Sequence, residues 1–497
     1  MSTTQHGGLL SWDICPGPDK TKQRMHSPSR LPRSLFLACL MSLACAAAHA
    51  QLPPPVPKGQ ETITPREPGV PGEEAATPPL PETENWDAKF QSTYIWQGKP
   101  SFNSPYRGPN SLSPNKESSY TWTVTGYFGL RPWEGGEIYF NPEGIQGRAL
   151  SNVTGLGGPT NAELQKSVAT EMRFYRARLY YRHTFGLGGT PVGLEPDQNQ
   201  MAGVVDSRRF VVTAGNLSLT DIMGTSDIAG DGRTQFLNWA SLDHGAYDYA
   251  ADARGFSWGV FGELYWDSWA VRAGRFLQPR VSNGLQLDYR IFKRYGDQAE
   301  LERRVSIGGQ PGVIKGFVFR NVASMGAYAD ALAAASGTGN PPVLADVRHP
   351  QSKWGGGLSW EQSFTSDIRG LVRWGANDGH TESYAFTEID RDFFTALQVM
   401  GNRWGRAADN IGIAWAVNGL SSGHRAYLAA GGLGFFLGDG QLNYGDEKIF
   451  EAYYSYVPFT KVKGLAISLD WQHITNPGYN RDRGPVDVGS VRVHFEF

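Results

Sequence analysis

Three features of the sequence predict an all-β fold, a transmembrane antiparallel β-barrel of about sixteen strands with short periplasmic turns and long extracellular loops. The first is a recurrent alternation of apolar and polar residues with a period of two. The second is a chain that ends on an aromatic residue within such a segment, and the third is a regular succession of short and long connections. A barrel strand needs about ten residues, apolar outward and polar inward, and closure of the barrel leaves no strand edge exposed.

The clearest predicted strand is the last one, Asp487 to Phe497, which reads DVGSVRVHFEF. Successive strand residues point to opposite sides, so one face is apolar and the other is polar. The two faces are Val491, Val493, Phe495 and Phe497 against Ser490, Arg492, His494 and Glu496. The terminal Phe497 resembles the assembly signal of bacterial outer-membrane proteins. An ordinary amphipathic strand of a soluble sheet is the alternative for this segment taken alone.

The composition argues against several other classes of protein. The chain has 497 residues, with 46 Lys and Arg against 48 Asp and Glu, so it lacks the cationic excess of a nucleic-acid binder. Its mean hydropathy is −0.38, and no apolar run reaches the roughly 18–20 residues of a spanning helix. A membrane barrel gives no such run, because half of each strand is polar.

The N-terminus predicts a secretory signal peptide over residues 1–50. Arg30 and Arg33 precede the apolar run Leu35–Ala48, and small residues surround a cleavage point after Ala50. Met25 is an alternative start that would give a signal of ordinary length. The three cysteines all precede the predicted cleavage point, so the mature protein would have neither a disulfide nor a thiolate metal site; they are Cys15, Cys39 and Cys45.

Residues 51–84 are dense in Pro, with Glu and Thr, and have no apolar period. This composition predicts an extended periplasmic linker. The barrel would then occupy residues 85–497, where the alternating segments lie. The predicted strands are 88–97, 120–130, 136–142, 174–185, 209–216, 256–266, 269–277, 299–308, 312–320, 353–364, 368–376, 393–401, 410–418, 448–456, 464–472 and 487–497.

The connections between these segments favour an outer-membrane barrel over a soluble sandwich. Asp267-Ser268, Gly309–Pro311 and Thr365–Asp367 are tight turns, and long loops alternate with them. Short periplasmic turns and long outer loops are typical of outer-membrane barrels. The stretch Gly186–Arg208 breaks this rule, because it is long where a short turn is expected.

Segment Phe174–Phe185 is the most informative about the barrel interior. On a regular strand Arg176, Arg178 and Arg182 share one face with Tyr180. A charged residue on the lipid face costs about 2–4 kcal/mol at the bilayer midplane, so we expect these arginines to face the lumen. There they would donate forked hydrogen bonds to hydroxyls or attract anions. The alternative is that they pair with inward acids such as Glu263 and brace the wall.

The longest connection, Leu217–Gly255, carries the segment FLNWASLDHGAYDYAAD. It combines aromatic rings such as Trp239, which can pack on the C–H surfaces of sugars, with carboxylates such as Asp243, which can bind hydroxyls. Long loops are often functional, so these residues are candidate sugar contacts. They would equally serve to hold the loop against the wall. The predicted pore-constriction residues are therefore Arg176, Arg178, Arg182, Tyr180, Glu263, Trp239 and Asp243.

No catalytic or metal site is predicted, and no cofactor is expected. Gly419-Leu420-Ser421-Ser422-Gly423 matches G-x-S-x-G, but it lies in an outer loop rather than at a strand-to-helix turn. The ten histidines show no spacing of metal ligands. An outer-membrane enzyme is thus the least favoured of the functions considered.

Several blocks of the sequence resemble the carbohydrate-selective porins of the OprB family, over about Asn85 to Phe497. They read SPYRGPNSL, NPEGIQGRALSN, FLNWASLDHGAYDYAAD, FTEIDR, YLAAGGLGFFLGDG and NPGYNRDRGPV, beginning at Ser104, Asn141, Phe236, Phe386, Tyr427 and Asn476. The resemblance implies a sixteen-stranded barrel that passes sugars by facilitated diffusion. It also implies a channel narrowed by inward loops with arginines, acids and aromatics, for which Arg176, Arg178, Glu263 and Trp239 match by residue type.

The expected function is therefore passive diffusion of sugars across a Gram-negative outer membrane. A general or anion-preferring diffusion porin is the alternative if the inward arginines dominate the field. The expected partners are mono- or oligosaccharide solutes, outer-membrane lipid, and the barrel-assembly machinery through Phe497. A homotrimer is an assembly that the sequence leaves open, as it does the identity of the sugar, and no nucleic acid is expected.

Overall fold

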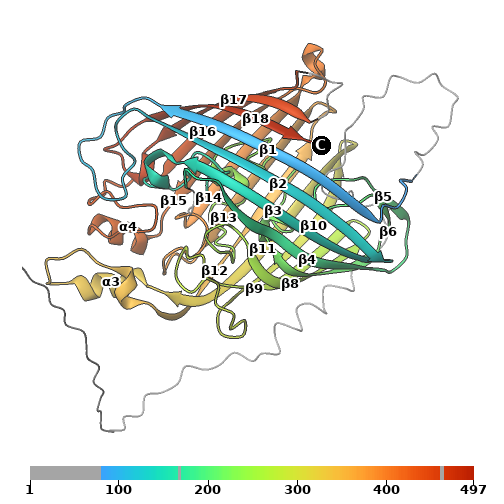
Figure 1. Cartoon of the computed structure of the whole chain (residues 1–497). Helices are drawn as coiled ribbons and strands as arrows, with labels where there is room; N and C mark the ends of the chain where they lie inside the picture. The colour runs from blue at the N-terminus through green and yellow to red at the C-terminus, as the bar shows by residue number, and fades with distance from the viewer. Residues whose placement is uncertain (1–79, 166–168, 459–463) are drawn as a thin grey trace, which may run out of the picture. The chain divides into compact units, whose positions relative to one another are not determined.

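The computed structural model describes residues 80–165, 169–458 and 464–497. Within them, sixteen antiparallel strands form one closed barrel, and two further strands, β5 and β6, form a separate hairpin (Figure 1). The predicted signal peptide and the predicted linker up to residue 79 lie outside the described residues. The predicted fold class, an all-β barrel of about sixteen strands, is confirmed.

Each barrel strand pairs with its sequence neighbour, except that β4 pairs with β7 across the inserted hairpin, and the last strand closes onto the first. The strands are β1 (Trp86–Lys99), β2 (Glu117–Trp133), β3 (Gly136–Arg148), β4 (Arg173–Gly186), β7 (Arg209–Leu217), β8 (Ser257–Trp266), β9 (Trp269–Leu277), β10 (Tyr295–Ile307), β11 (Gln310–Met325), β12 (His349–Ser363), β13 (Ile368–Asn377), β14 (Arg391–Met400), β15 (Asn410–Gly419), β16 (Glu447–Tyr456), β17 (Leu465–Thr475) and β18 (Val486–Glu496).

Every predicted strand corresponds to one of these, but several strands are longer than predicted. β11, for example, pairs with β12 as far as Met325 and His349, beyond the predicted end at 320. The predicted turn Gly309–Pro311 lies one residue too late. The turn is formed by Gly308 and Gly309, whose φ angles of 61° and 78° are left-handed and favour glycine, and Pro311 already belongs to β11.

Closure of the barrel involves the last residue of the chain. β1 pairs with β18 from Gln91 opposite Glu496 to Gly98 opposite Gly489. Beyond this ladder, Phe497 and Phe90 exchange two backbone hydrogen bonds of 3.0 and 3.1 Å, and their rings lie 5.7 Å apart. The predicted pairing of the first and last strands is therefore present.

The outward face of the barrel is apolar, as a lipid-facing surface requires. Its large side chains include Trp122, Trp133, Leu358, Trp374 and Leu469, which are 40% to 61% exposed. Outward arginines near both ends stack on aromatic rings of this face. Examples are Arg275 over Tyr295 and Arg320 over Trp354 at the extracellular end, and Arg208 over Trp266 and Arg303 over Trp269 at the periplasmic end.

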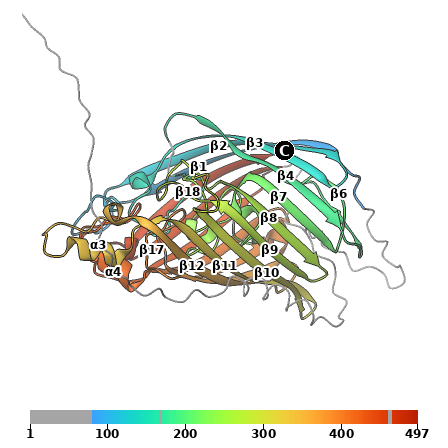
Figure 2. The same cartoon turned by 90° about the horizontal axis from the view of Figure 1, so that it is seen from below.

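The two ends of the barrel differ. The helices α3 (Tyr328–Ala335) and α4 (Ser422–Ala429) belong to long loops at one end, and the hairpin of β5 (Pro191–Leu194) and β6 (Gly203–Asp206) lies at the other (Figures 1 and 2). Long loops mark the extracellular end, so the hairpin is periplasmic. It occupies the stretch Gly186–Arg208, for which the sequence predicted no structure. No helix among the described residues has the length and apolar character needed to cross a membrane.

Candidate functional site

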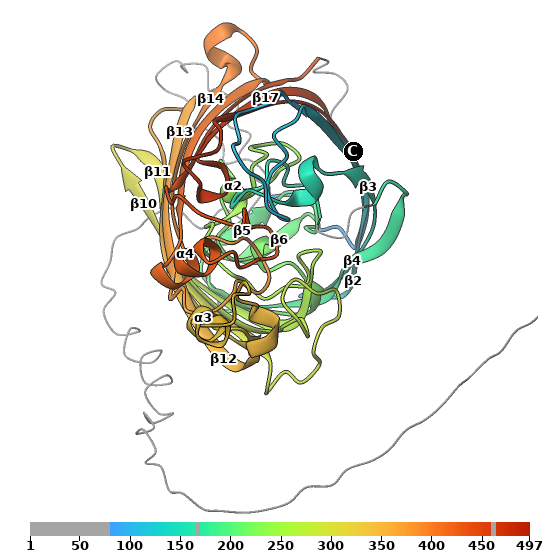
Figure 3. The ribbon, with the colours of Figure 1, turned by 90° about the vertical axis from the view of Figure 1, so that its left-hand side faces the viewer.

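Most of the barrel interior is occupied by the segment that joins β7 to β8, residues 218–256, which we call the inner loop. It contains the 3₁₀ turn η3 (Leu219–Asp221) and the short helix α2 (Trp239–Leu242). Figure 3 shows α2 inside the ring of strands, and the hydrogen bonds described below join this segment to strands on the far side of the barrel. The inner loop therefore narrows the channel from within.

Two buried arginines of the wall hold the inner loop through its backbone. Arg373 on β13 is 0% exposed and donates to the carbonyls of Ser241 and Ala229 at 2.9 and 2.8 Å. Arg492 on β18 donates to the carbonyls of Gly232 and Gln235. Buried carbonyls need donors, and a guanidinium supplies five N–H groups, so each arginine can serve several carbonyls at once.

Carboxylates of the wall bind the backbone N–H groups of the same loop. Glu451 on β16 accepts hydrogen bonds from the N–H groups of Leu237 and Asn238. Asp392 on β14 accepts one from Ala246 at 2.8 Å. These wall groups and the two arginines were not among the predicted site residues, and they bind the loop rather than face an open passage.

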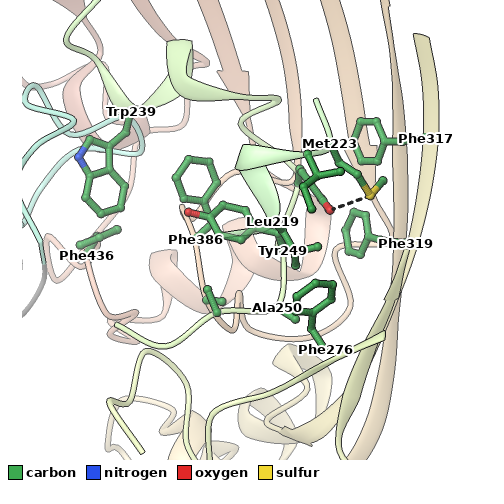
Figure 4. Close-up of a cluster of buried hydrophobic side chains, with 14 of the residues drawn as sticks. Leu219, Met223, Trp239, Tyr249, Ala250, Phe276, Phe317, Phe319, Phe386 and Phe436 are labelled. Atoms are coloured by element: carbon green, nitrogen blue, oxygen red, sulfur yellow. Dashed lines mark hydrogen bonds between the residues drawn. The ribbon is translucent and has the colours of Figure 1, made fainter. Parts of the chain in front are cut away.

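Trp239 and Asp243, two predicted site residues, lie in the core of the inner loop. The Trp239 side chain stacks on Phe386 and meets Phe436 edge-on, with both ring centroids 5.7 Å away, and its indole N–H donates to the Asn161 carbonyl (Figure 4). Asp243 is 1% exposed, and burial raises its pKa to about 7 despite the nearby Arg373 guanidinium. Neither lines the cavities described below, so both hold the loop and are not placed to contact a solute.

Below the inner loop, a cavity of about 320 Å³ opens in the periplasmic half of the lumen. Its wall is formed by inward side chains of β4 and β7 to β13, by Asp221 to Asp227 of the inner loop, and by the periplasmic hairpin. Two of the predicted residues, Arg182 and Glu263, line it. Of the described residues that line the cavity, six are cationic and six are acidic: Arg182, Arg209, Arg272, Arg304, Lys315 and Arg369, against Glu137, Asp221, Asp227, Glu263, Glu302 and Glu361.

Arg178, Tyr180 and Arg182 face the lumen, as predicted from the alternation. The Arg178 Nε and Nη2 atoms each lie 2.7 Å from an oxygen of Asp221. The Arg182 guanidinium lies over the Tyr180 ring, donates to the Asn199 carbonyl at 3.1 Å, and is 3.6 Å from Glu137. Both arginines are therefore paired with acids, but with acids other than Glu263.

Arg176 does not face the lumen, so this part of the prediction is wrong. The ladder between β3 and β4 shifts between Asn141 and Pro142, which pair with Arg178 and Arg176 and leave Ala177 as an extra residue. The bulge reverses the alternation above it. The Arg176 guanidinium lies 5.0 Å from the ring of the outward Trp258, whereas the Tyr175 hydroxyl binds Glu143 inside the barrel.

Glu263 is part of a wall network centred on Arg272, a residue that was not predicted. Arg272 on β9 donates to Glu263 at 3.1 Å, to Glu300 at 2.8 Å and to Glu302 at 2.7 Å. Glu263 also accepts a hydrogen bond from the Tyr265 hydroxyl. Wall bracing, the alternative role for inward acids, is thus present at Glu263, with Arg272 as the partner. The period-two pattern of β9 does place Arg272 inward, and that signal could have identified it.

Arg233 of the inner loop is a second residue that was not predicted. It lies 2.8 Å from Glu143 on β3 and 2.8 Å from Glu163 of the preceding extracellular loop, and it also donates to Thr125. The side chain therefore joins the inner loop to the β2–β3 side of the barrel. Nothing in its sequence neighbourhood signals these partners.

A second cavity, of about 500 Å³, lies on the extracellular side next to β4. Among the described strands, β7 pairs with β4 only from Leu179 down to Gly186, so the upper part of β4 has no partner on this side. The cavity is lined by Tyr175, Arg176, Asn216, Asp252, Arg254, Phe256, Trp258, Arg280, Leu285, Gln286, Leu287 and Tyr289. The Arg178 guanidinium lies 5.3 Å from the Phe256 ring, so the Arg178–Asp221 pair connects the linings of the two cavities.

Ser421 of the G-x-S-x-G match has a structural role. Its hydroxyl accepts a hydrogen bond from the His424 backbone N–H at the start of α4 and donates to the Gly379 carbonyl at 2.7 Å. The His424 ring turns away, with Nδ1 3.0 Å from Asp390. Among the described residues, no group of three or more His, Cys, Asp and Glu side chains is arranged to hold a metal ion.

Comparison with known proteins adds a family and a fold. The model of the family described as "Carbohydrate-selective porin, OprB family" matches residues 129–497. The high-pH structure of Pseudomonas putida OprB is 15% identical, with a TM-score of 0.64 over 83% of this chain and 94% of that chain. At this identity the likeness shows the fold.

Two further solved structures have lower TM-scores. The low-pH structure of Pseudomonas putida OprB scores 0.44 at 11% identity, over 83% of this chain and 93% of that chain. The outer-membrane channel DcaP of Acinetobacter baumannii scores 0.47 at 8% identity, over 83% of this chain and 97% of that chain. No curated protein matches the chain.

Proposed function

Because the chain belongs to the OprB family of carbohydrate-selective porins, we propose that its selectivity for sugars arises at the Arg178–Asp221 pair and in the cavity beneath it. The protein is a sugar-selective channel of the Gram-negative outer membrane, and a β-barrel porin rather than an enzyme in fold and family. Transport through it is passive diffusion down the concentration gradient of the solute.

The observation that carries this proposal is the position of the Arg178–Asp221 pair. Arg178 packs beside Phe256 of the extracellular cavity, and Asp221 lines the periplasmic cavity. The side chains are 16% and 29% exposed, so both remain open to a passing molecule. A guanidinium offers N–H donors and a carboxylate offers acceptors, which together match the hydroxyl groups of a sugar.

The charge of the periplasmic cavity favours neutral solutes over anions. Its six cationic side chains are matched by six acidic ones, so the formal charge of the lining is zero. An anion-preferring porin needs a lumen in which positive charge dominates. The balance therefore supports the sugar-selective function over the general or anion-preferring alternative.

Single-channel conductance in planar bilayers tests the function directly. With the purified barrel in a symmetric salt solution, added monosaccharides or short oligosaccharides should lower the ion current by occupying the passage. The reversal potential in a salt gradient should show weak selectivity between small cations and anions. A strong anion preference together with an absence of sugar block would instead support the general diffusion porin.

Processing and assembly remain predictions of the proposed function. Cleavage after Ala50 would give a mature chain that begins at Gln51 and contains no cysteine. N-terminal sequencing of the protein from outer membranes checks this, and a retained Cys45 would contradict it. A homotrimer would be revealed by the mass of the detergent-solubilised protein corrected for bound detergent.

A further inference from the structure

The connection between β4 and β7 is longer than the barrel needs. Gly186 pairs directly with Arg209, so a tight turn could join the two strands. Residues 187–208 instead form the β5–β6 hairpin, in which Pro191 pairs with Asp206 and Leu194 with Gly203. Figure 1 shows β5 and β6 at the periplasmic end, and Figure 3 shows them within the ring of strands when viewed from the other end.

The tip of the hairpin, residues 195–202, is attached to the inner wall of the barrel. The Asn199 carbonyl accepts a hydrogen bond from Arg182 on β4, and the Met201 N–H donates to the Tyr139 hydroxyl on β3 at 3.3 Å. Gln198 donates to the Gln91 side chain on β1 at 2.7 Å. Met201 is 0% exposed and packs in the cluster that includes Tyr139 and Tyr180. The tip thus reaches from β4 to β1 along the periplasmic mouth.

The chain just before β1 fixes the hairpin from the other side. Glu84 and Ala202 exchange two hydrogen bonds, from the Glu84 N–H to the Ala202 carbonyl at 3.0 Å and from the Ala202 N–H to the Glu84 carboxylate at 2.7 Å. Arg131 on β2 donates to the carbonyls of both residues. Because the hairpin is held on two sides, it has the fixed position that a selective constriction requires.

The hairpin brings an apolar surface into a cavity that is otherwise highly charged. Leu194 and Val205 line the cavity from the hairpin, and Arg304 and Lys315 line it from β10 and β11. In the closed order of sixteen strands, β11 is eight strands from β1, to which the hairpin tip is attached, so the charged wall lies across the mouth. A sugar ring has the matching character, because its C–H faces are apolar and its rim carries hydroxyl groups.

We infer that the β5–β6 hairpin is an exit collar, a second constriction that selects sugar rings by both size and amphipathic shape. This inference rests on the proposed function, since it takes the cavity to be part of the sugar path. The C–H face of a ring would pack on Leu194 and Val205, while the hydroxyl groups bind the charged wall. Long oligosaccharides would be retained at the collar, because a hairpin attached at both sides leaves only part of the mouth open.

Two neighbouring residues on opposite faces of β6 allow a matched test. Val205 lines the cavity, whereas Val204 is 41% exposed. Each is replaced by cysteine, and the channel is treated in planar bilayers with methanethiosulfonate reagents of increasing size. Modification of the Val205→Cys channel should reduce both conductance and sugar block several-fold, and modification of the Val204→Cys channel should leave them unchanged. The unsubstituted protein exposed to the same reagents gives the background.

A second variant replaces residues 187–208 by an Asn-Gly turn. In liposome-swelling assays it should admit linear glucose oligomers that the unaltered channel excludes, and its conductance should rise several-fold. Equal effects of the reagents at Val204→Cys and Val205→Cys, or an unchanged oligomer limit in a folded hairpin-less barrel, would overturn the collar. These results leave sugar block intact, whereas failure of the proposed function would appear as no sugar block in the unaltered protein.

Discussion

Arg178 and Asp221 form a two-pronged ion pair in which Nε and Nη2 of the arginine each lie 2.7 Å from a different carboxylate oxygen. Arg178 is on the barrel wall and Asp221 is on the inner loop, so the pair joins the two structures that bound the passage. Parallel hydrogen bonds of this kind fix orientation as well as distance. The remaining donors and lone pairs are left for a solute.

Replacement of Arg178 by Ala should weaken sugar block of the ion current several-fold and shift ion preference towards cations. The variant loses one donor group and leaves the Asp221 carboxylate without its guanidinium. A hydrogen bond to a charged group contributes about 1.5–3 kcal/mol, and competition from water in the pore reduces the net effect. Sugar titrations and reversal potentials in planar bilayers measure both changes.

Arg176→Ala is the matched control for this experiment, because Arg176 is two residues away on the same strand but lies over the outward Trp258. It should leave sugar block unchanged. Asp221→Asn should shift ion preference in the opposite direction, towards anions. If Arg178→Ala in a well-folded barrel behaves like Arg176→Ala, Arg178 does not belong to the selective site.

Replacement of Arg373 by Met should loosen the inner loop while keeping the barrel. The substitution removes the donors of the Ser241 and Ala229 carbonyls from a buried position. Each buried group left unsatisfied costs about 1–3 kcal/mol, so we expect noisier single-channel currents and new trypsin cleavage after Arg233. Arg320→Met, on the outward face over Trp354, is the control and should show neither effect. Resistance of the Arg373→Met inner loop to trypsin, with quiet currents, would contradict this role.

The inner loop should be more stable at pH 5 than at pH 8 because of Asp243. Burial raises the pKa of this carboxyl from 3.8 to about 7, so the folded loop binds a proton more readily than the unfolded chain does. Stability from this group is therefore full below pH 4 and falls as the pH rises towards 7 and above. Asp243→Asn should remove this dependence, as measured by trypsin cleavage rates between pH 5 and 8. An equal pH dependence in the variant would assign it to another group.

Deletion of Phe497 should block insertion into the outer membrane and leave secretion to the periplasm intact. Phe497 makes two backbone hydrogen bonds to Phe90 at the barrel seam, yet its side chain is 70% exposed and therefore accessible for recognition during assembly. Cell fractionation and the heat-dependent shift of folded barrels in gel electrophoresis measure the outcome. Phe497→Tyr, which keeps the aromatic ring, should insert normally. A normal yield of the truncated barrel would refute the prediction.

The strands could be predicted because a barrel wall imposes a period of two on every segment, whatever the partner strand. This pattern placed Arg178, Tyr180 and Arg182 correctly. It failed at Arg176, since one extra residue at Ala177 reverses the alternation and leaves no mark in the polarity of the sequence. The β5–β6 hairpin was not predicted for a related reason: its tip is held by residues from β1, β3 and β4, and a short strand pair has little pattern of its own.

The anchors of the inner loop could not be predicted, because their partners are backbone atoms. The alternation of β13 puts Arg373 on the inward face, but nothing in the sequence shows that it binds the Ser241 carbonyl rather than a carboxylate or water. Trp239 shows the same limit. Its aromatic character suits sugar binding, yet the rings of Phe386 and Phe436, far away in the sequence, enclose it.

The wall anchors of the inner loop also determine when the channel can become selective during folding. Arg492 is 260 residues beyond Gly232, and Arg373 is 132 residues beyond Ser241, so the loop is synthesised long before the groups that hold it. Contacts between such distant segments form late, after the intervening chain has been ordered. The seam between β1 and β18 must therefore close before the carbonyls of the loop find their donors. Selectivity is the last property that this barrel acquires, and a chain arrested before closure would have a wall without a filter.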